Sequence, residues 1–413
     1  MRVAIHTLGT RGDVQPYLAL ALGLMNRGHA VQLAAPAQFE GMASALGVPF
    51  SPLPGEFLAL LDTPEGKAAV AGGKGFSAGF KLLKTVRPLM RRLLDEEWHA
   101  VSAFVPDVIV YHPKSIAAAH MAEKLGCRCV LASPLPGFTP TSAFPSPLLP
   151  FRSLGPFNRA SHVLAIKGAG LLFGKLIMDW RATTLGLSRR RESSVAPSGT
   201  LYAYSRHVVP IPSDWGDDVL VSGYWFLDSE DWTPSASLKA FLDAGEPPVY
   251  AGFGSMPGID PQHMASMIID ALARCGKRGL LASGGGALEA DRLPPHVHLI
   301  DHAPHDALLP LVAATIHHGG AGTVAASLRA GKPMTICPFL GDQPFWARRM
   351  NELGVAPPPL DRKTMTADSI AFAIKAMSDA DMRARANALG ERVRQEDGVG
   401  MAVRFLEARC GPR

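Results

Sequence analysis

The sequence predicts an α/β protein built from two doubly wound domains. Short apolar runs alternate with longer helical segments, a pattern typical of βα units around a parallel sheet. At 413 residues, the chain also exceeds what one hydrophobic core usually holds. A polar, aromatic stretch after Pro212 separates two such halves. We therefore predict a first domain over 1–213, a linker over 214–235 and a second domain over 236–398.

Pairs of a strand and a following helix recur in chain order. The first half contains strand 3–7 before helix 17–27, and strand 108–111 before helix 115–125. A Pro-rich segment, 131–156, is predicted to be an ordered loop. The second half contains strand 248–253 before helix 261–274, and an apolar segment, 308–316, before a small-residue helix over 323–330. This alternation places loops at the carboxyl ends of parallel strands, where open α/β sheets bind ligands.

Composition restricts the class of protein. The five cysteines are scattered, and Cys127 and Cys129 are too close for an easy disulfide, which favours a reducing cytoplasm. The N-terminus has no signal-peptide pattern. The longest apolar stretch, 163–178, is interrupted by Lys167 and Lys175 and falls short of a bilayer span. We expect a soluble, cytoplasmic protein that is at most peripheral to a membrane.

The net charge of +5 comes largely from two basic segments, 81–92 and 181–191. The first segment mixes cations with Leu, Val and Met at roughly helical spacing, so a solvated helix face over the core is the favoured interpretation. The alternative is transient contact with anionic lipid. Nucleic acid is not an expected partner, because the excess is modest and no binding motif accompanies it.

The most informative segment is His317-His318-Gly319-Gly320-Ala321-Gly322-Thr323. Small residues there let backbone N–H groups and a helix N-terminus approach an anion closely, and an imidazole can add a hydrogen bond or a positive charge. Asp342 and Gln343 follow and offer acceptors and donors for sugar hydroxyls. The arrangement suits a nucleoside-diphosphate sugar.

Asp13 is the first candidate in the other half. It follows the first strand and a glycine-bearing turn, so it lies at the ligand-binding end of a parallel strand. Capping of the helix that begins at Val14 explains an aspartate there equally well. The residues themselves leave both interpretations open.

Three segments, 9–16, 134–141 and 341–346, together resemble the sterol 3-beta-glucosyltransferase branch of the inverting UDP-glycosyltransferases (glycosyltransferase family 1). The similarity spans nearly the whole chain, in order. It implies the GT-B arrangement, two Rossmann-like domains facing across a cleft, with a final helix over 399–413 returning to the first domain. It also implies transfer of a hexose, glucose above others, from a UDP-sugar to the hydroxyl of a sterol, triterpenoid or other lipophilic natural product.

The resemblance assigns roles in the first domain. Asp13 occupies the place of the histidine base of plant relatives, which implies that Asp13 is the general base. His112 falls where those relatives carry an aspartate that orients the base. It could bond Asp13, contact the acceptor or cap a loop. Phe138 and Phe144 are candidates for an apolar acceptor pocket, although core packing accounts for most aromatic residues in any domain.

In the second domain, His318 aligns with the family's diphosphate-binding histidine. The expected donors beside it are Ser255, Gly320, Ala321, Gly322 and Thr323, and capping would explain Ser255 as well. His317 is expected to pack or to orient its neighbour. His302 and Ala303 stand where plant relatives hold uracil with a tryptophan, and Ala326 replaces their ribose-binding glutamate, so TDP stays an alternative to UDP. Asp342 and Gln343 match the donor-sugar contacts.

Neither a metal nor a cofactor besides the nucleotide-sugar co-substrate is expected. The Asp-x-Asp sequence at 379–381 precedes an Arg-rich helical stretch, where helix capping explains it. A nicotinamide-binding motif is broken by Pro257. An epimerase or hydrolase of the same architecture, and a non-catalytic homologue that binds sugar nucleotide or lipid, remain as alternatives.

Overall fold

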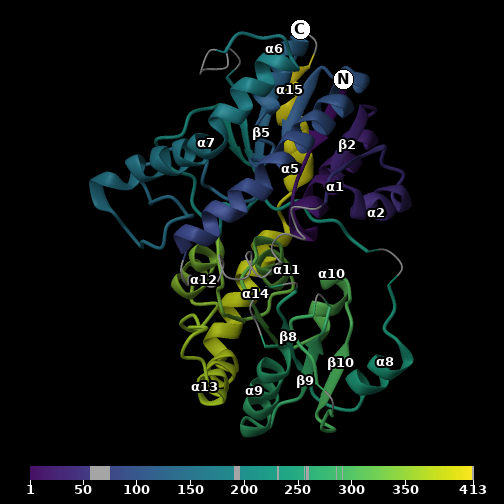
Figure 1. Ribbon diagram of the computed structural model, residues 1–413. Helices are drawn as coiled ribbons and strands as arrows, with labels where there is room; N and C mark the ends of the chain where they lie inside the picture. Colours follow the sequence, from purple (N-terminus) through teal and green to yellow (C-terminus); the bar gives the residue numbers. More distant parts are fainter. Residues whose placement is uncertain are drawn as a thin grey trace. The chain divides into compact units, whose positions relative to one another are not determined.

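The computed structural model describes residues 1–55, 75–189, 196–229, 232–254, 256, 260–284, 286–290 and 292–411, apart from the side chains of 75–85 and 169–172. Two compact units divide these residues. Unit 1 contains Met1–Arg206, Pro210–Leu227 and Asp397–Arg413, and unit 2 contains His207–Val209 and Asp228–Glu396. Figure 1 shows the elements of each unit.

Unit 1 is organised around a seven-stranded parallel sheet of order β3-β2-β1-β4-β5-β6-β7. Its strands are β1 (Arg2–His6), β2 (Ala30–Pro36), β3 (Phe50–Leu53), β4 (Val108–Tyr111), β5 (Arg128–Ser133), β6 (Thr200–Tyr202) and β7 (Val219–Val221). Its helices are α1 (Arg11–Asn26), η1 (Ala37–Phe39), α2 (Glu40–Ala45), α5 (Gly75–Phe104), α6 (Ala118–Leu125), η2 (Gly155–Phe157), α7 (Asn158–Thr183) and α15 (Gly398–Cys410).

Helices cover both faces of this sheet, because successive side chains of a strand point to opposite faces. Val3 and Ile5 of β1 pack in one core with α1, α2 and α15, whereas Ala4 packs in another with α5 and α6. β1 is therefore buried on both sides, as a central parallel strand must be. The last helix belongs to the same core: Leu406 of α15 is buried there, and Glu407 pairs with Arg27 at 3.0 Å.

Unit 2 contains a five-stranded parallel sheet of order β10-β9-β8-β11-β12. Its strands are β8 (Val249–Gly252), β9 (Gly279–Ala282), β10 (Val297–Ile300), β11 (Ala314–His317) and β12 (Met334–Ile336). Its helices are α8 (Ala236–Asp243), α9 (Pro261–Arg274), α10 (His305–Leu308), η3 (Leu309–Leu311), α11 (Ala321–Arg329), α12 (Gln343–Glu352), α13 (Ala367–Met377) and α14 (Ala380–Arg394).

Both sheets have the same internal order, third, second, first, fourth and fifth strand, which is the doubly wound arrangement. The predicted fold class is confirmed. In each unit the strand order reverses between the first and fourth strands, β1 and β4 in unit 1 and β8 and β11 in unit 2. Ligands of open α/β sheets bind beyond the carboxyl ends of strands at such a switch point.

Several boundaries differ from the prediction, and three of the differences have a clear physical reason. Part of the predicted linker, 214–235, forms β7 of the first sheet, because a three-residue strand is too short to give a periodic signal. Helix α1 begins at Arg11 rather than near Tyr17, since Thr10 takes the extended N-cap conformation and Pro16 is accommodated inside the helix. Helix α11 begins at Ala321 rather than Thr323, because Gly320 is its N-cap.

The basic segments are largely used within unit 1. In α5, Met90, Leu93 and Leu94 are buried while Arg87 is exposed, which supports a solvated helix face over the core; the side chains of 81–85 lie outside the described residues. Arg181 is buried and pairs with Glu123 at 2.6 Å. In the described part of the chain, no single helix is long and apolar enough to cross a membrane, although a pair bent by 53°, Gly155–Gly168 and Phe173–Thr183, passes that test together.

Candidate functional site

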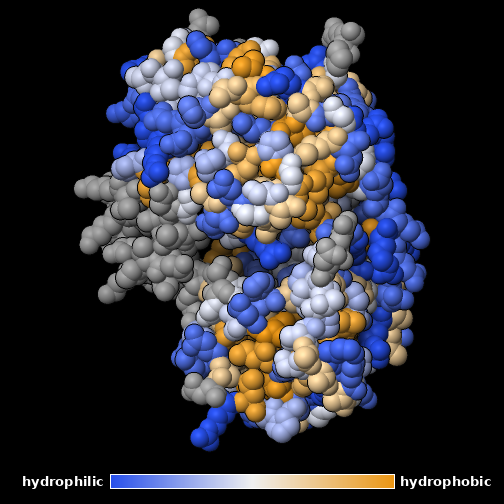
Figure 2. Space-filling model, turned by 90° about the vertical axis from the view of Figure 1, so that its right-hand side faces the viewer, coloured by the Kyte–Doolittle hydropathy of each residue, from blue (hydrophilic) through white to orange (hydrophobic). Residues whose placement is uncertain are grey.

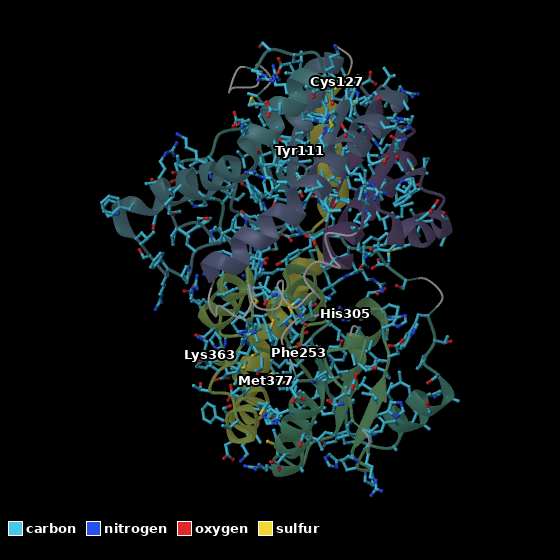
Figure 3. The ribbon with its side chains drawn as sticks, in the orientation of Figure 1. Tyr111, Cys127, Phe253, His305, Lys363 and Met377 are labelled. Carbon is cyan, nitrogen blue, oxygen red and sulfur yellow. The ribbon has the colours of Figure 1, made fainter. Side chains whose placement is uncertain are left out.

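Asp13 and His112 lie at the switch point of unit 1. Asp13 is in the first turn of α1, directly after β1, and His112 follows Tyr111, the last residue of β4 (Figure 3). The parallel register pairs His6 with Tyr111, and the His112 N–H donates to the His6 carbonyl at 2.8 Å. Strand pairing thus brings together two residues that are 99 positions apart, as predicted for an aspartate and a histidine at adjacent strand ends.

The carboxylate of Asp13 is held on several sides. Its Oδ2 accepts the Thr10 N–H at 2.8 Å, and its Oδ1 lies 3.0 Å from Lys114 Nζ and 3.5 Å from His112 Nε2. Gly9, at φ 132°, leaves the room for this pair, because a Cβ there would stand 2.1 Å from Asp13 Oδ2. Asp13 is therefore the third residue of α1, bonded back to the N-cap Thr10, and the alternative that it is the N-cap itself is wrong.

Burial makes His112 a neutral imidazole whose Nε2 faces Asp13 at 3.5 Å. Its Nδ1 accepts the backbone N–H of Lys114 at 3.1 Å, so the ring proton of the neutral form is on Nε2, the nitrogen that faces the carboxylate. Burial lowers the pKa of His112 to about 4, against the opposing effect of Asp13. Of the three interpretations offered by the sequence, capping of a loop fits the Nδ1 bond, and the Nε2 position beside Asp13 is compatible with a bond to it.

Lys114 is a member of this cluster that the sequence analysis missed. Burial by itself raises the pKa of Asp13, but the Lys114 ammonium, His112 and the Thr10 hydrogen bond outweigh it and hold that pKa below its usual value. The carboxylate is consequently ionised at neutral pH. The missing signal was positional, since Lys114 is in the same loop as His112, directly after a strand beside β1.

A buried acid braces the strand ends behind this cluster. Glu97 of α5 lies 3.1 Å from His6 Nδ1 and accepts the hydroxyl of Ser115, and all three side chains are buried. Ser115 also donates its N–H to the His112 carbonyl at 2.8 Å. His6 thus belongs to a contact that connects β1, α5 and the loop carrying His112, while its Nε2 has no hydrogen-bond partner among the described residues.

The two acceptor-pocket candidates lie in the Pro-rich loop. The Phe138 N–H donates to the Tyr202 hydroxyl at 3.2 Å, and the Phe144 ring lies 5.8 Å from the ring of His162. Both phenylalanines are half-buried. Their role as an acceptor wall stays a prediction.

In unit 2, the glycine-rich turn follows β11. Gly319 has φ 90°, and a Cβ there would stand 2.5 Å from Ile336 Cγ2, so both the conformation and the space favour glycine. Gly320 is the N-cap of α11, and Ala321, Gly322 and Thr323 form its first turn. A glycine cap supplies no side-chain acceptor, so the N–H groups of this turn are available to an anion.

Three histidines gather at this turn. His317 is buried, which agrees with the packing role offered for it, and its Nδ1 accepts the Gly319 N–H at 3.0 Å. His318 Nδ1 is buried without a hydrogen-bond partner among the described residues. Burial, and then His305 of α10 (Figure 3), lower the pKa of His318 to about 4. His318 is therefore neutral at pH 7.

The sugar-contact candidates join the turn through its backbone. A Cβ at Gly319 would stand 3.5 Å from the Gln343 carbonyl, so the two motifs are packed together. Asp342 is the N-cap of α12 and accepts the Trp346 ring N–H at 2.8 Å. Gln343 differs from the expectation, because its side-chain oxygen accepts the N–H groups of Phe339 and Leu340. That oxygen braces the preceding loop, and the amide NH2 donates to Met256 Sδ at 3.4 Å, so both ends of the buried Gln343 amide have protein partners.

The remaining predicted residues divide into three cases. His302 is exposed after β10, bonded to Asp301 at 2.9 Å, while Ala303 packs against a core of unit 2. Ser255 lies outside the described residues. Asp379 caps α14 by accepting the Met382 N–H at 2.9 Å, so its capping role is confirmed.

Across the described residues, no group of three or more His, Cys, Asp or Glu is placed to hold a metal ion.

Two protein-family models match the chain. Residues 3–145 match the N-terminal domain of glycosyltransferase family 28, and residues 269–398 match the C-terminal domain of proteins like erythromycin biosynthesis protein CIII. The first match contains Asp13 and His112, and the second contains the His318 turn with Asp342. We call the Asp13 cluster of unit 1 and the His318 turn of unit 2 the two half-sites. Each of them falls inside a matched region.

Curated relatives match nearly the whole chain. A sterol 3-beta-glucosyltransferase of Arabidopsis thaliana is 35% identical over 98% of this chain, and a second from that plant is 34% identical. The chain spans 67% and 65% of their lengths. A sterol 3-beta-glucosyltransferase of Emericella nidulans is also 34% identical, but the chain spans only 30% of it.

Solved structures agree on the fold. The calicheamicin glycosyltransferase CalG4 superposes with a TM-score of 0.74 at 20% identity, over 99% of this chain and 98% of that one. The kitacinnamycin glycosyltransferase superposes with a TM-score of 0.72 at 19% identity and the same coverage. Together with the plant relatives, these matches show that the chain belongs to the GT-B glycosyltransferase family that includes the sterol 3-beta-glucosyltransferases.

Proposed function

We propose that the chain transfers glucose from UDP-glucose to the hydroxyl of a sterol-like alcohol, with inversion at the anomeric carbon. The observation that carries this proposal is the ionised Asp13 carboxylate at the switch point of unit 1, held by Thr10, His112 and Lys114. The relatives named as sterol 3-beta-glucosyltransferases, up to 35% identical, support the acceptor class and the sugar.

In the proposed reaction, Asp13 takes the proton of the acceptor hydroxyl. The hydroxyl oxygen forms a bond to the anomeric carbon on the face opposite the diphosphate, and the bond from that carbon to the diphosphate oxygen breaks. UDP leaves with the electron pair. A positioned base contributes about 10²–10⁴-fold to such a step. The low pKa of Asp13 keeps the base ionised at neutral pH, although its intrinsic basicity is lower.

Unit 2 would stabilise the leaving group. The N–H groups at the start of α11 and the His318 ring can bond the diphosphate, where negative charge develops as the bond breaks. His318 is neutral without the donor, since burial and His305 lower its pKa. A diphosphate beside it would favour the charged imidazolium, so donor binding is expected to take up a proton.

Several finer features belong to the same proposal. Metal independence is supported by the capping role of Asp379, which accounts for the chain's Asp-x-Asp sequence. Cytoplasmic location is supported by five cysteines that are all unpaired thiols. TDP-glucose is the alternative donor, because His302 and Ala326 replace the base and ribose contacts of plant relatives. Possession of both half-sites disfavours a non-catalytic homologue.

The test is mass spectrometry of purified protein with UDP-glucose or TDP-glucose and a panel of lipophilic alcohols that includes cholesterol. A hexose-shifted sterol with a β-anomeric proton coupling by NMR is the expected product. Asp13→Asn is the matched control, because an asparagine oxygen can still accept the Thr10 N–H. Product formation by Asp13→Asn at the wild-type rate would remove Asp13 from the role of base, and an α-linked product would exclude inversion.

A further inference from the structure

The first half of α7 has polar side chains on the side that faces the protein and apolar side chains among those that face outward. Asn158, Ser161 and His162 are buried, whereas Leu164 is 69% exposed and Phe157, the last residue of η2 directly before α7, is 70% exposed. Helices on the surface of a soluble domain normally show the opposite arrangement. Figure 1 shows α7 extending outward from the sheet of unit 1.

The inward polar side chains fasten the Pro-rich loop. Asn158 donates to the Ser142 carbonyl at 3.0 Å, Ser161 accepts the Ser146 N–H at 2.8 Å, and His162 Nε2 lies 3.0 Å from the Phe144 carbonyl oxygen. These bonds satisfy the backbone of a loop that has no sheet or helix partner of its own. They fix which face of α7 points inward, so the outward position of the apolar side chains follows from the packing.

The outward side chains form one apolar surface over α7 and the loop before it. Its members, all exposed, are Leu148, Phe151, Phe157, Val163, Leu164 and Ile166; we call this surface the α7 apolar face. Single exposed apolar residues are common, but six of them along one helix and its preceding loop mark an interaction site. Figure 2 shows the side of the molecule that is at the right in Figure 1, where hydrophobic residues lie in groups separated by hydrophilic ones.

The segment that carries this face has positive charges alone. Residues 124–178 contain no Asp or Glu, whereas Arg152, Arg159 and Lys167 are exposed next to the apolar side chains. One carboxylate from elsewhere, Asp214, reaches Arg159 at 3.5 Å and is also bonded by Thr141 and Ser142. An apolar surface that has cations beside it and no acids of its own is complementary to a partner whose outer layer is negatively charged and whose interior is apolar.

We propose that the α7 apolar face docks unit 1 onto the surface of a bilayer containing anionic lipid. Phe157 and Leu164 enter the boundary between headgroups and acyl chains, and Arg152 and Lys167 contact the headgroups, as in interfacial amphipathic helices. The face lies on the membrane rather than spanning it, because its cations flank the apolar side chains. The docking is independent of the proposed reaction and goes beyond it.

The first test is flotation of the full-length protein with vesicles of phosphatidylcholine and about one third phosphatidylserine. Wild-type protein should float with these vesicles, less with phosphatidylcholine alone, and less as salt rises. The double variant F157S/L164S should lower the partition coefficient at least about tenfold, because two large apolar side chains no longer leave water. Lys167→Glu should lower the partition coefficient for vesicles that contain phosphatidylserine and leave it unchanged for vesicles of phosphatidylcholine alone.

Phe372→Ser is the matched control, because Phe372 of α13 in unit 2 is 69% exposed. It should float as wild type does. Absence of wild-type flotation, or an equal loss in Phe372→Ser, would overturn the proposal. So would a concentration-dependent dimer that F157S/L164S abolishes while flotation persists, since the face would then cover a second copy. Donor hydrolysis and soluble-acceptor turnover, measured in parallel, should be unchanged in F157S/L164S, which separates failure of docking from failure of the proposed function.

Discussion

The two units have the same strand order, but the residues at their switch points differ in charge: those of unit 1 are ionised and those of unit 2 are neutral. In unit 1, the residues after β1 and β4 gather charge, the Asp13 carboxylate against the Lys114 ammonium. In unit 2, the residues after β11 offer neutral histidines, glycines and the start of α11. Each loop contains a glycine of positive φ, Gly9 and Gly319, where a Cβ would meet a neighbour. The topology thus supplies the location, and the loop residues decide whether it suits a proton acceptor or an anion site.

The largest effect should come from the charged half-site. Asp13→Asn is expected to lower kcat by about 10²–10⁴-fold, since it removes the proton acceptor. UDP binding by calorimetry and the melting temperature should stay close to wild type, because the oxygen that accepts the Thr10 N–H is kept. If Asp13→Asn also lost affinity for UDP, the half-site of unit 1 would contribute to donor binding, and the two half-sites would not be functionally distinct.

The neutral half-site should respond through the donor. His318→Ala is expected to lower kcat by about 10²–10³-fold, the usual effect of removing one group that stabilises developing negative charge. Donor affinity should fall as well. In the wild type, calorimetry in buffers of different ionisation enthalpy should detect proton uptake on UDP binding below neutral pH, because His318 begins with a pKa of about 4. The same proton uptake in His318→Ala would assign it elsewhere.

Gly319→Ala separates strain from crowding in the second half-site. The substitution should destabilise the protein by about 1–3 kcal/mol, because the left-handed conformation and the contact with Ile336 both penalise a Cβ. Gly276→Ala is the matched control in unit 2, with φ 58° and open space around the added atom. Urea denaturation should therefore show a smaller loss for Gly276→Ala, and equal losses would mean that crowding at Gly319 contributes nothing.

The smallest effect should be a shift in pH dependence. Lys114→Met should raise the pKa of Asp13, so the acid limb of kcat/KM should move to higher pH, while activity at neutral pH changes little. Because the folded-state pKa of Asp13 is lowered, its pairing stabilises the fold above the unfolded pKa and is lost as pH falls through the folded one. The stability change should stay within about 1 kcal/mol, since Lys114 is largely exposed.

Lys114→Arg should keep the acid limb of the kcat/KM profile at its wild-type pH. Lys124→Met, which removes an exposed cation elsewhere in unit 1, should not shift that limb. An unchanged limb in Lys114→Met would show that Lys114 does not control the ionisation of Asp13. The profile should be measured with a soluble acceptor so that lipid presentation does not alter it.

The residues that sequence analysis located correctly share one property: each directly follows a strand that its own composition reveals. Asp13, His112 and the His318 turn come after buried, β-branched runs, so parallel pairing brings them to one edge. Lys114 and His305 were missed because their importance depends on a contact across chain segments far apart. The side-chain oxygen of Gln343 was assigned to sugar, but the local turn of 339–343 uses it first.

The α7 apolar face shows the limit most clearly. Phe151 and Phe157 are large apolar residues, yet packing placed them outside. The spacing of apolar residues along α7 could not distinguish its inward side from its outward side, because the inward side chains are polar. Their hydrogen-bond partners are carbonyl and amide groups of a loop more than ten positions away.

By itself, the sequence determined the two doubly wound units, their family and the strand ends where chemistry gathers, because alternating apolar runs and glycine turns are local properties of the chain. Tertiary structure decided the ion pair of Lys114 with Asp13, the proton position on His112 and the outward direction of Phe157. Those features depend on distances between residues that neighbour each other only after β1 and β4 pair, or after α7 fastens its loop.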